Sequence, residues 1–267
     1  MKLYVSGTIT LLFLISGIRG AFDGATDWSA SRGRATSAIS EGAASFWANP
    51  SGILSGGKWN SVAILKREWG LAELATGKTA VVLPTKWGTF AAGGSFTGDP
   101  ALFTETIIGV AYARELGRFG IGGRINLAMA KSEEWSASTV IIGFGGFVPA
   151  GNILTFGAWA DNITASKLDG NELPVKAAVG ALLEPTDWVG LTADVYLEGD
   201  YPATLRFGQE ISLARIFFIR SGVNFRPNCF HLGLGTRYRG FELSWAYIGH
   251  PELGGSTLLG LTYEGIE

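Results

Sequence analysis

The sequence predicts an all-β fold: a transmembrane antiparallel up-and-down β-barrel of about fourteen strands, with a small N-terminal hatch. Three observations support this prediction. From Trp59 onward, apolar and polar residues alternate with a period of two, which is typical of strands with one apolar and one polar face. Every second connection between these segments is very short. Charged residues make up only 16% of the chain, against about 25% in soluble domains, while aromatic residues reach 12% and Gly is abundant at 39.

The first twenty residues are typical of an export signal. Lys2 supplies the positive end, "LLFLISGI" the apolar centre and Gly20 a small residue before a cleavage site. A helical membrane anchor is less favoured, because the apolar run is short and interrupted by Ser6, Gly7 and Thr8. We therefore expect a signal peptide at residues 1–20, a hatch or plug segment at 21–56, a barrel at 57–267, and a location in the cell outer membrane.

Composition argues against several other classes of protein. Without Lys2 and Arg19 the 21 basic residues fall to 19, against 23 acidic ones, so the exported chain has a net charge near −4 and no nucleic-acid partner is expected. Cys229 is the only cysteine, which excludes an intrachain disulfide. With His231 and His250 as the only histidines, a zinc site of the usual kind is not expected, and no cofactor is predicted.

Fourteen alternating segments have lengths close to the roughly 9–11 residues that a membrane strand needs. They lie at 58–68, 77–84, 88–98, 103–116, 118–130, 135–149, 152–162, 173–184, 188–198, 202–213, 215–226, 229–238, 241–249 and 255–264. Short connections such as Gly117 and Ala150-Gly151 alternate with longer ones such as 67–77 and 163–172. Short turns at one end and longer loops at the other are typical of a transmembrane barrel.

Aromatic residues gather at both ends of the predicted strands. Beside the short turns are Trp87, Phe119, Phe147, Trp188, Phe217 and Phe241; near the longer loops are Trp69, Trp135, Tyr201, Phe225 and Tyr247. Two aromatic girdles at the membrane interfaces would give this distribution. A soluble sandwich or propeller is the alternative, but neither predicts that short and long connections alternate.

Residues 21–56 do not alternate and are predicted to form the hatch. They are small and polar, with a possible short helix over Thr36–Ala44 and then the turn Asn49-Pro50-Ser51-Gly52. Pro fixes one backbone angle, Asn and Ser can bond back to the chain, and Gly accepts a positive φ. Irregular backbone of this kind cannot face lipid, where its polar groups would stay unpaired. We therefore expect this segment inside or under the barrel lumen.

The stretch "GRATSAISEGAASFWANPSGIL" resembles the N-terminal signature of the outer-membrane FadL-like superfamily, a Gly/Ala-rich run that leads to an Asn-Pro-Ala-Gly-Leu turn. Asn49, Pro50 and Gly52 match, while Ser51 and Ile53 replace Ala and Leu. The resemblance implies a fourteen-stranded barrel with a hatch in its lumen. The superfamily includes long-chain fatty-acid transporters and the shorter PorV/PorQ-type proteins associated with type IX secretion, to which this chain is closer in length. Such barrels normally end on an aromatic residue, whereas four residues follow Tyr263 here.

No catalytic site is predicted, because neither histidine has a nucleophile at a recognisable spacing. If the apolar face of each strand meets lipid, the lumen collects a set of polar residues: Arg124, Lys176, Asp194, Arg206, Glu210, Arg220, Arg237 and Glu242. Adjacent strands are about 4.8 Å apart, so opposite charges on them can pair. Two interpretations stay open. The set is either a salt-bridge ladder that braces the lumen and anchors the hatch, or a selectivity ring or ligand site.

Two functional hypotheses follow. The first is a passive channel for small hydrophobic solutes that the hatch gates, with Phe46, Trp47 and Ile53 adding apolar surface to a pocket. The second is a non-enzymatic, PorV/PorQ-like partner subunit of a secretion or surface-attachment system. The expected partners are outer-membrane lipids, together with hydrophobic small molecules in the first case and secretion-system proteins in the second.

Overall fold

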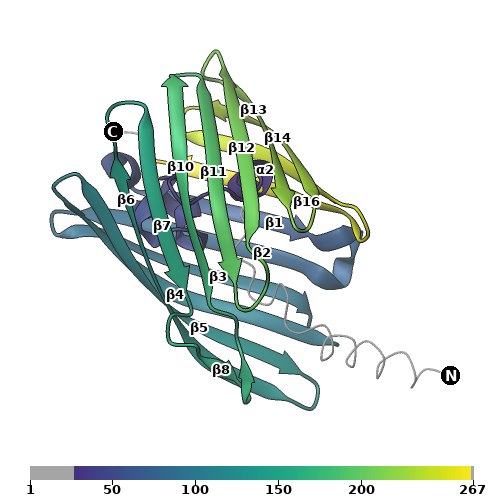
Figure 1. Cartoon of the computed structure of the whole chain (residues 1–267). Helices are drawn as coiled ribbons and strands as arrows, with labels where there is room; N and C mark the ends of the chain where they lie inside the picture. Colours follow the sequence, from purple (N-terminus) through teal and green to yellow (C-terminus); the bar gives the residue numbers. More distant parts are fainter. Residues whose placement is uncertain (1–26, 266–267) are drawn as a thin grey trace.

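In the computed structural model, which describes residues 27–265, the chain forms a closed antiparallel barrel of fourteen strands (Figure 1). The barrel strands are β1 (Asn60–Arg67), β2 (Ala75–Thr85), β3 (Gly88–Asp99), β4 (Phe103–Leu116), β5 (Phe119–Ser132), β6 (Ser136–Pro149), β7 (Leu154–Asp161), β10 (Lys176–Thr186), β11 (Val189–Glu198), β12 (Thr204–Leu213), β13 (Phe217–Phe225), β14 (Cys229–Tyr238), β15 (Phe241–His250) and β16 (Gly254–Glu264). Strand β1 pairs with β16 and closes the ring. The predicted fold class is confirmed, while the predicted signal peptide lies outside the described residues.

One loop contains structure that the alternation of the sequence did not predict. Between β7 and β10, the strands β8 (Lys167–Leu168) and β9 (Asn171–Glu172) form a two-stranded hairpin. Because β7 is short, it pairs only with Phe144–Pro149 of the longer β6. Beyond that point the loop lies along β6 instead, and Ile163 N donates to the Ile142 carbonyl at 3.1 Å.

The outer wall of the barrel is apolar, as the alternation predicts. On β5, for example, Ile125 is 52% exposed and the neighbouring Arg124 is buried on the inner side. Five of the six aromatic residues predicted beside short turns are exposed: Trp87, Phe119, Trp188, Phe217 and Phe241. The prediction for Phe147 is wrong. Inward positions on β6 fall on odd residue numbers, so the Phe147 side chain lies on the inner face of the wall. A Cβ added to Gly120, on the same face, would come within 3.0 Å of the Phe147 ring.

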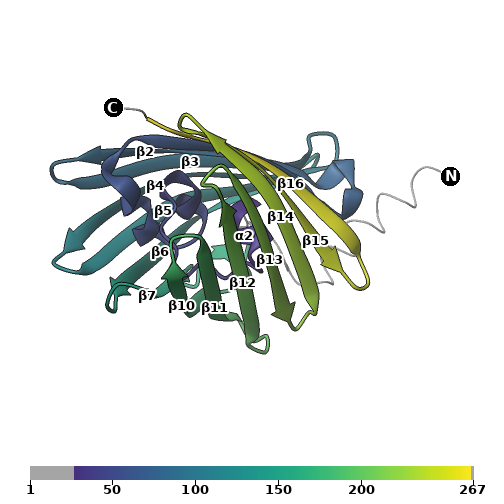
Figure 2. The same ribbon diagram turned by 90° about the horizontal axis from the view of Figure 1, so that it is seen from above.

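The N-terminal segment lies inside the ring of strands, where Figure 2 shows it in purple. It contains a short helix α2 (Asp27–Ser31) and two 3-10 helices, η1 (Gly42–Trp47) and η2 (Pro50–Gly57). Two further 3-10 turns, η3 (Glu68–Gly70) and η4 (Ala72–Leu74), lie in the loop between β1 and β2. No helix among residues 27–265 is long and apolar enough to cross a membrane.

Two local predictions about this segment are corrected. The helix expected over Thr36–Ala44 does not form, because Gly42 has a φ of +56°, which interrupts a right-handed helix, and the 3-10 helix begins only there. The role given to Gly52 is also wrong: its φ is not positive. Gly52 is needed for space, since an added Cβ would lie 2.6 Å from Ser45 Oγ and 2.7 Å from the Ile39 carbonyl oxygen.

Candidate functional site: the hatch in the barrel lumen

Glycines on the inner face of the wall leave room for the hatch, defined here as residues 27–57. At seven of them an added Cβ would come within 3.0 Å of a hatch atom: Gly93, Gly122, Gly145, Gly157, Gly208, Gly222 and Gly233. These residues belong to β3, β5, β6, β7, β12, β13 and β14, so they surround the segment on several sides. A side chain at these positions would displace the hatch, because closely packed interiors tolerate extra volume poorly. The wall and the hatch are therefore complementary in shape.

The Asn49 side chain fixes the turn that begins η2. Its Oδ1 accepts hydrogen bonds from Ser51 N at 3.1 Å and Ser51 Oγ at 2.7 Å, which is the usual capping arrangement at a helix start. Its Nδ2 donates to the Ser37 carbonyl at 2.7 Å and to the Gly146 carbonyl of the wall at 3.2 Å. Pro50 and Ser51 are buried beside it. The predicted Asn-Pro-Ser-Gly turn thus links two parts of the hatch to each other and to β6.

Asp194 on β11 makes the densest set of polar contacts to the hatch. Its Oδ2 accepts from Thr36 N at 2.8 Å, from Ser37 N at 3.0 Å and from Ser37 Oγ at 2.7 Å. The side chain is almost fully buried, with 4% of its surface exposed. Three donors around one carboxylate oxygen stabilise its charge and hold the turn at Thr36-Ser37 against the wall.

Other polar contacts to the hatch reach backbone carbonyls. Arg124 donates to the carbonyl of Phe46 and forms an ion pair with Asp161 at 3.0 Å. Arg206 donates to the carbonyl of Arg34 at 3.2 Å. His231 lies 2.5 Å, Nδ1 to oxygen, from the carbonyl of Ala30. These contacts satisfy backbone groups of an irregular segment that has few partners of its own.

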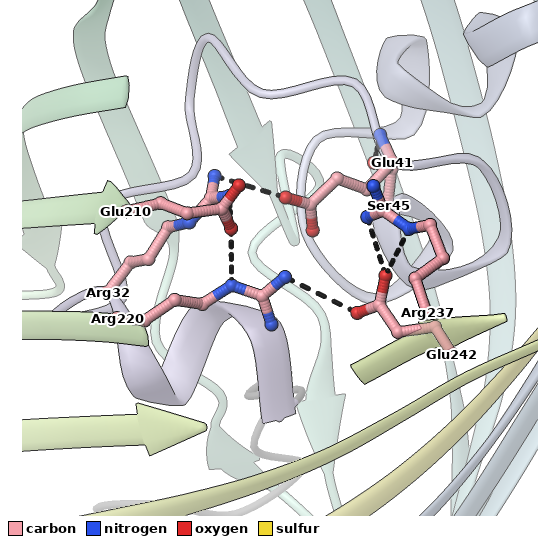
Figure 3. A network of polar contacts seen from close by, with 7 residues as sticks. All are labelled: Arg32, Glu41, Ser45, Glu210, Arg220, Arg237 and Glu242. Atoms are coloured by element: carbon pink, nitrogen blue, oxygen red, sulfur yellow. Dashed lines mark hydrogen bonds and ion pairs between the residues drawn. The ribbon is translucent and has the colours of Figure 1, made fainter. Parts of the chain in front are cut away.

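A network of charges connects the hatch to the wall, and Figure 3 shows its members pointing toward one another. Arg32 of the hatch pairs with Glu210 of β12, and its Nη1 lies 3.2 Å from Glu41 Oε1. Glu41 N also donates to Ser45 Oγ at 2.9 Å. Burial raises the pKa of Glu41 to about 8, against the opposing attraction of Arg32 and Arg220. The hatch therefore holds this carboxyl in its neutral form near pH 7.

The network continues along the wall toward the short-turn end. Arg220 Nε lies 2.5 Å from Glu210 and its Nη2 3.3 Å from Glu242. Glu242 also receives two bonds from Arg237, at 2.6 and 3.1 Å. Glu210 and Arg220 face each other in the register of β12 and β13, as do Arg237 and Glu242 on β14 and β15. Antiparallel register thus places opposite charges side by side.

All eight predicted lumen residues take part in a hydrogen bond or an ion pair with the hatch or with a neighbouring strand. Arg124, Asp194 and Arg206 contact the hatch directly, and Glu210 does so through Arg32. Lys176 lies 3.8 Å from Glu198 on the neighbouring strand. The side chain of Arg237 is the most open of the set, at 49% exposure, because it lies beside the short turn after β14.

Part of the lumen is apolar, which the sequence analysis missed by assigning apolar faces to lipid. The apolar seam consists of the buried inward side chains Val62, Ile64, Val82, Ile107, Ile248 and Leu258, which pack in one cluster with Phe46, Trp47 and Ile53 of the hatch. The rings of Phe46 and Trp47 meet edge to face, with centroids 4.9 Å apart. A signal was present: "VAIL", "AVVL" and "STLLGL" carry apolar residues at both parities, so both faces of these strands are apolar.

The two histidines lie in different surroundings. His231 is buried against the hatch, and His250 Nδ1 accepts from the backbone of its own loop, at 3.2 Å from Glu252 N and 3.1 Å from Leu253 N. Within residues 27–265 there is no group of three or more His, Cys, Asp or Glu side chains that could hold a metal ion.

No family model and no curated protein matches the sequence. Solved structures do match the fold. The Ralstonia pickettii toluene transporter TbuX aligns with a TM-score of 0.66 at 11% identity, over 92% of this chain and 99% of that one. The P. putida toluene transporter TodX aligns with a TM-score of 0.63 at 10% identity, over 92% and 100%. The monoaromatic hydrocarbon channel CymD aligns at 0.59 and 11%, over 91% and 100%. This chain is thus similar in fold to hydrocarbon channels along nearly its whole length.

Proposed function

We propose that this protein is a FadL-like outer-membrane channel for small hydrophobic solutes, with residues 27–57 as its gate. The observation that carries the proposal is the apolar seam of the lumen. A pore for ions or sugars gains nothing from Ile64, Ile107 and Leu258 on its inner wall, whereas an apolar solute is stabilised there by burial of its surface. The solved hydrocarbon channels of the same fold support the same solute class.

The gate acts by exchange of apolar contacts. In the docked state, Phe46 and Ile53 are fully buried against the seam, so a solute must take the place of these side chains. Apart from Arg124, which donates to the Phe46 carbonyl, the charged side chains of the wall that hold the hatch lie elsewhere, with Asp194 on β11 and Glu210 on β12. One side of the hatch can therefore yield to an apolar solute while the other stays attached to the wall.

The test is uptake of a labelled monoaromatic hydrocarbon by cells with an intact outer membrane that express the chain. Uptake should exceed that of cells without it, and Ile107→Asn should reduce it because a polar side chain then enters the seam. Thr192→Asn, an inward change on β11, is the matched control and should leave uptake largely unchanged. Equal uptake with and without the chain would refute the channel.

A second candidate is the PorV/PorQ-like partner subunit, for which the close fit of the hatch is the supporting observation. Glycines on seven strands make room for the hatch, and such a fit suits a permanent filling as well as a gate. Affinity purification from native membranes distinguishes the two. Stable co-purification of secretion proteins, together with hydrocarbon uptake equal to that of cells without the chain, would favour the partner subunit.

A further inference from the structure

A group of three cationic side chains lies outside the barrel at its short-turn end. Lys86 is in the turn between β2 and β3, Arg118 is in the turn between β4 and β5, and Arg114 is near the end of β4. The two turns are adjacent, because β3 and β4 pair up to Thr89–Ala113, one step before Gly88 and Arg114. All three cations are exposed. We call them the basic patch.

Arg114 faces outward, toward the surroundings of the barrel. Ile108, Val110 and Tyr112 occupy the preceding outward positions of β4 and are 57%, 58% and 39% exposed. Since side chains alternate along a strand, Arg114 continues this apolar row at its end. Glu115, the neighbouring acid, belongs to the opposite face of the strand by the same alternation.

The basic patch has no acidic partner in the part of the chain that the structure describes. None of its three members takes part in an ion pair there, whereas Arg215 in the short turn between β12 and β13 lies 3.7 Å from Asp187. Lys86 instead lies over the ring of Trp87, 4.8 Å from its centroid. Three like charges on two adjacent turns repel one another, so an anion from outside the chain would relieve the repulsion.

An aromatic platform lies directly beside these charges. Trp87 is 65% exposed, and its carbonyl accepts from Tyr112 Oη at 2.6 Å. Phe90 packs on Tyr112 with ring centroids 5.0 Å apart. Together they form an apolar surface next to a cationic one on the outside of the barrel. This combination matches the acyl chains and the phosphate of a phospholipid.

The opposite end of the barrel has the other sign of charge. Acids outnumber cations in its loops: the acids include Glu73, Asp99, Glu133, Glu134, Asp169, Asp200 and Glu252, against the cations Arg67, Lys131, Lys167 and Arg226. In transmembrane barrels the short turns face the periplasm. An anionic lipid would therefore be attracted to the short-turn end and repelled from the loop end.

We propose that the basic patch binds the headgroup of an anionic glycerophospholipid, such as phosphatidylglycerol, in the periplasmic leaflet, with the acyl chains lying on Phe90 and Tyr112. The inference rests on the membrane location given in the proposed function, but not on solute transport. Each cation contributes about fivefold to affinity near an anionic surface, so the three together contribute roughly a hundredfold.

The test is native mass spectrometry of the full purified chain in detergent, titrated with phosphatidylglycerol and, separately, with phosphatidylcholine. The triple variant Lys86→Gln, Arg114→Gln, Arg118→Gln is compared with a matched control at the loop end, Arg67→Gln, Lys131→Gln, Arg226→Gln. Heat-dependent gel mobility reports whether each barrel is folded. The wild-type titration is repeated at high salt, which needs no variant and screens exposed charges.

The wild type and the loop-end control should bind phosphatidylglycerol at least tenfold more tightly than phosphatidylcholine. The triple variant should bind phosphatidylglycerol with roughly a hundredfold lower affinity. High salt should remove the wild type's preference. A triple variant that is folded and binds phosphatidylglycerol like the wild type would overturn the inference, as would a wild type that binds both lipids equally. Failure of hydrocarbon uptake with lipid preference intact would overturn the channel but leave the basic patch standing. A wild type without heat-dependent mobility would overturn both.

Discussion

Removal of the Asp194 carboxylate should release the hatch while the barrel stays closed. In Asp194→Ala, Thr36 N, Ser37 N and Ser37 Oγ lose their shared acceptor in a buried site. Each buried donor left unpaired costs about 1–3 kcal/mol, and water that enters the gap recovers part of this. We therefore expect docking to weaken by about 3 kcal/mol, which is roughly a hundredfold in the undocked population. The strand ladder does not depend on these bonds.

Cys229 provides the assay, because it is the only cysteine and lies in the same buried cluster as Ala30 of the hatch. When the hatch undocks, a water-soluble thiol reagent in the lumen can reach it. The labelling rate should rise roughly a hundredfold in Asp194→Ala. Asp187→Ala, which removes a carboxylate from an exposed turn, is the matched control and should label like the wild type. Wild-type labelling in a folded Asp194→Ala barrel would refute the anchoring role.

Three further predictions concern the same segment. Gly52→Val should also speed the labelling of the lumen cysteine, because its side chain would overlap Ser45, 2.6 Å from the added Cβ, and heat-dependent gel mobility should not change. Hatch docking should weaken between about pH 4.5 and 8, since Glu41 has a pKa of about 8 when docked and its ordinary value when undocked. The proton on the Glu41 carboxyl stabilises the docked state fully below pH 4.5, and this stabilisation is lost as the pH rises through 8. Channel-opening events in planar bilayers should therefore become more frequent from pH 6 to pH 9. The variant Glu41→Gln should show a weaker dependence on pH. Deletion of residues 27–54 should enlarge the single-channel conductance, because the lumen loses its filling; an unchanged conductance in a folded barrel would mean that the segment does not block ion flow.

The strand pattern of the wall could be predicted because it is a local property. A period of two follows from the geometry of a single extended strand, and the outward row through Ile121, Ile125 and Leu127 is visible without any partner strand. The exceptions are instructive. β7 is short and a hairpin follows it, and no alternation over residues 162–175 indicates where the chain leaves the wall.

The lumen could be predicted only in part. Eight of its charged residues were predicted, because a charged side chain on the face of a strand opposite to an apolar face is expected to point into the lumen of a membrane barrel. The buried Lys66 and Lys78, and the Arg124 partner Asp161, were not predicted. The apolar seam was missed because Ile64 and Leu258 resemble lipid-facing residues until a second segment is known to cover them. The same holds for the seven lumen glycines, whose lack of a side chain has meaning only once the hatch packs against them.

The sequence by itself determined the barrel, its apolar outer face, the charged part of its inner face, and the presence of an irregular segment marked by Asn49 and Pro50, because these depend on periodicity and on local backbone chemistry. Only the tertiary structure decided what that segment touches. Ser37 and Asp194 are 157 positions apart, and Arg32 and Glu210 are 178 apart. Closure of the ring through β1 and β16 brings such residues together, and the contacts depend on the number and stagger of all fourteen strands, which no local pattern encodes.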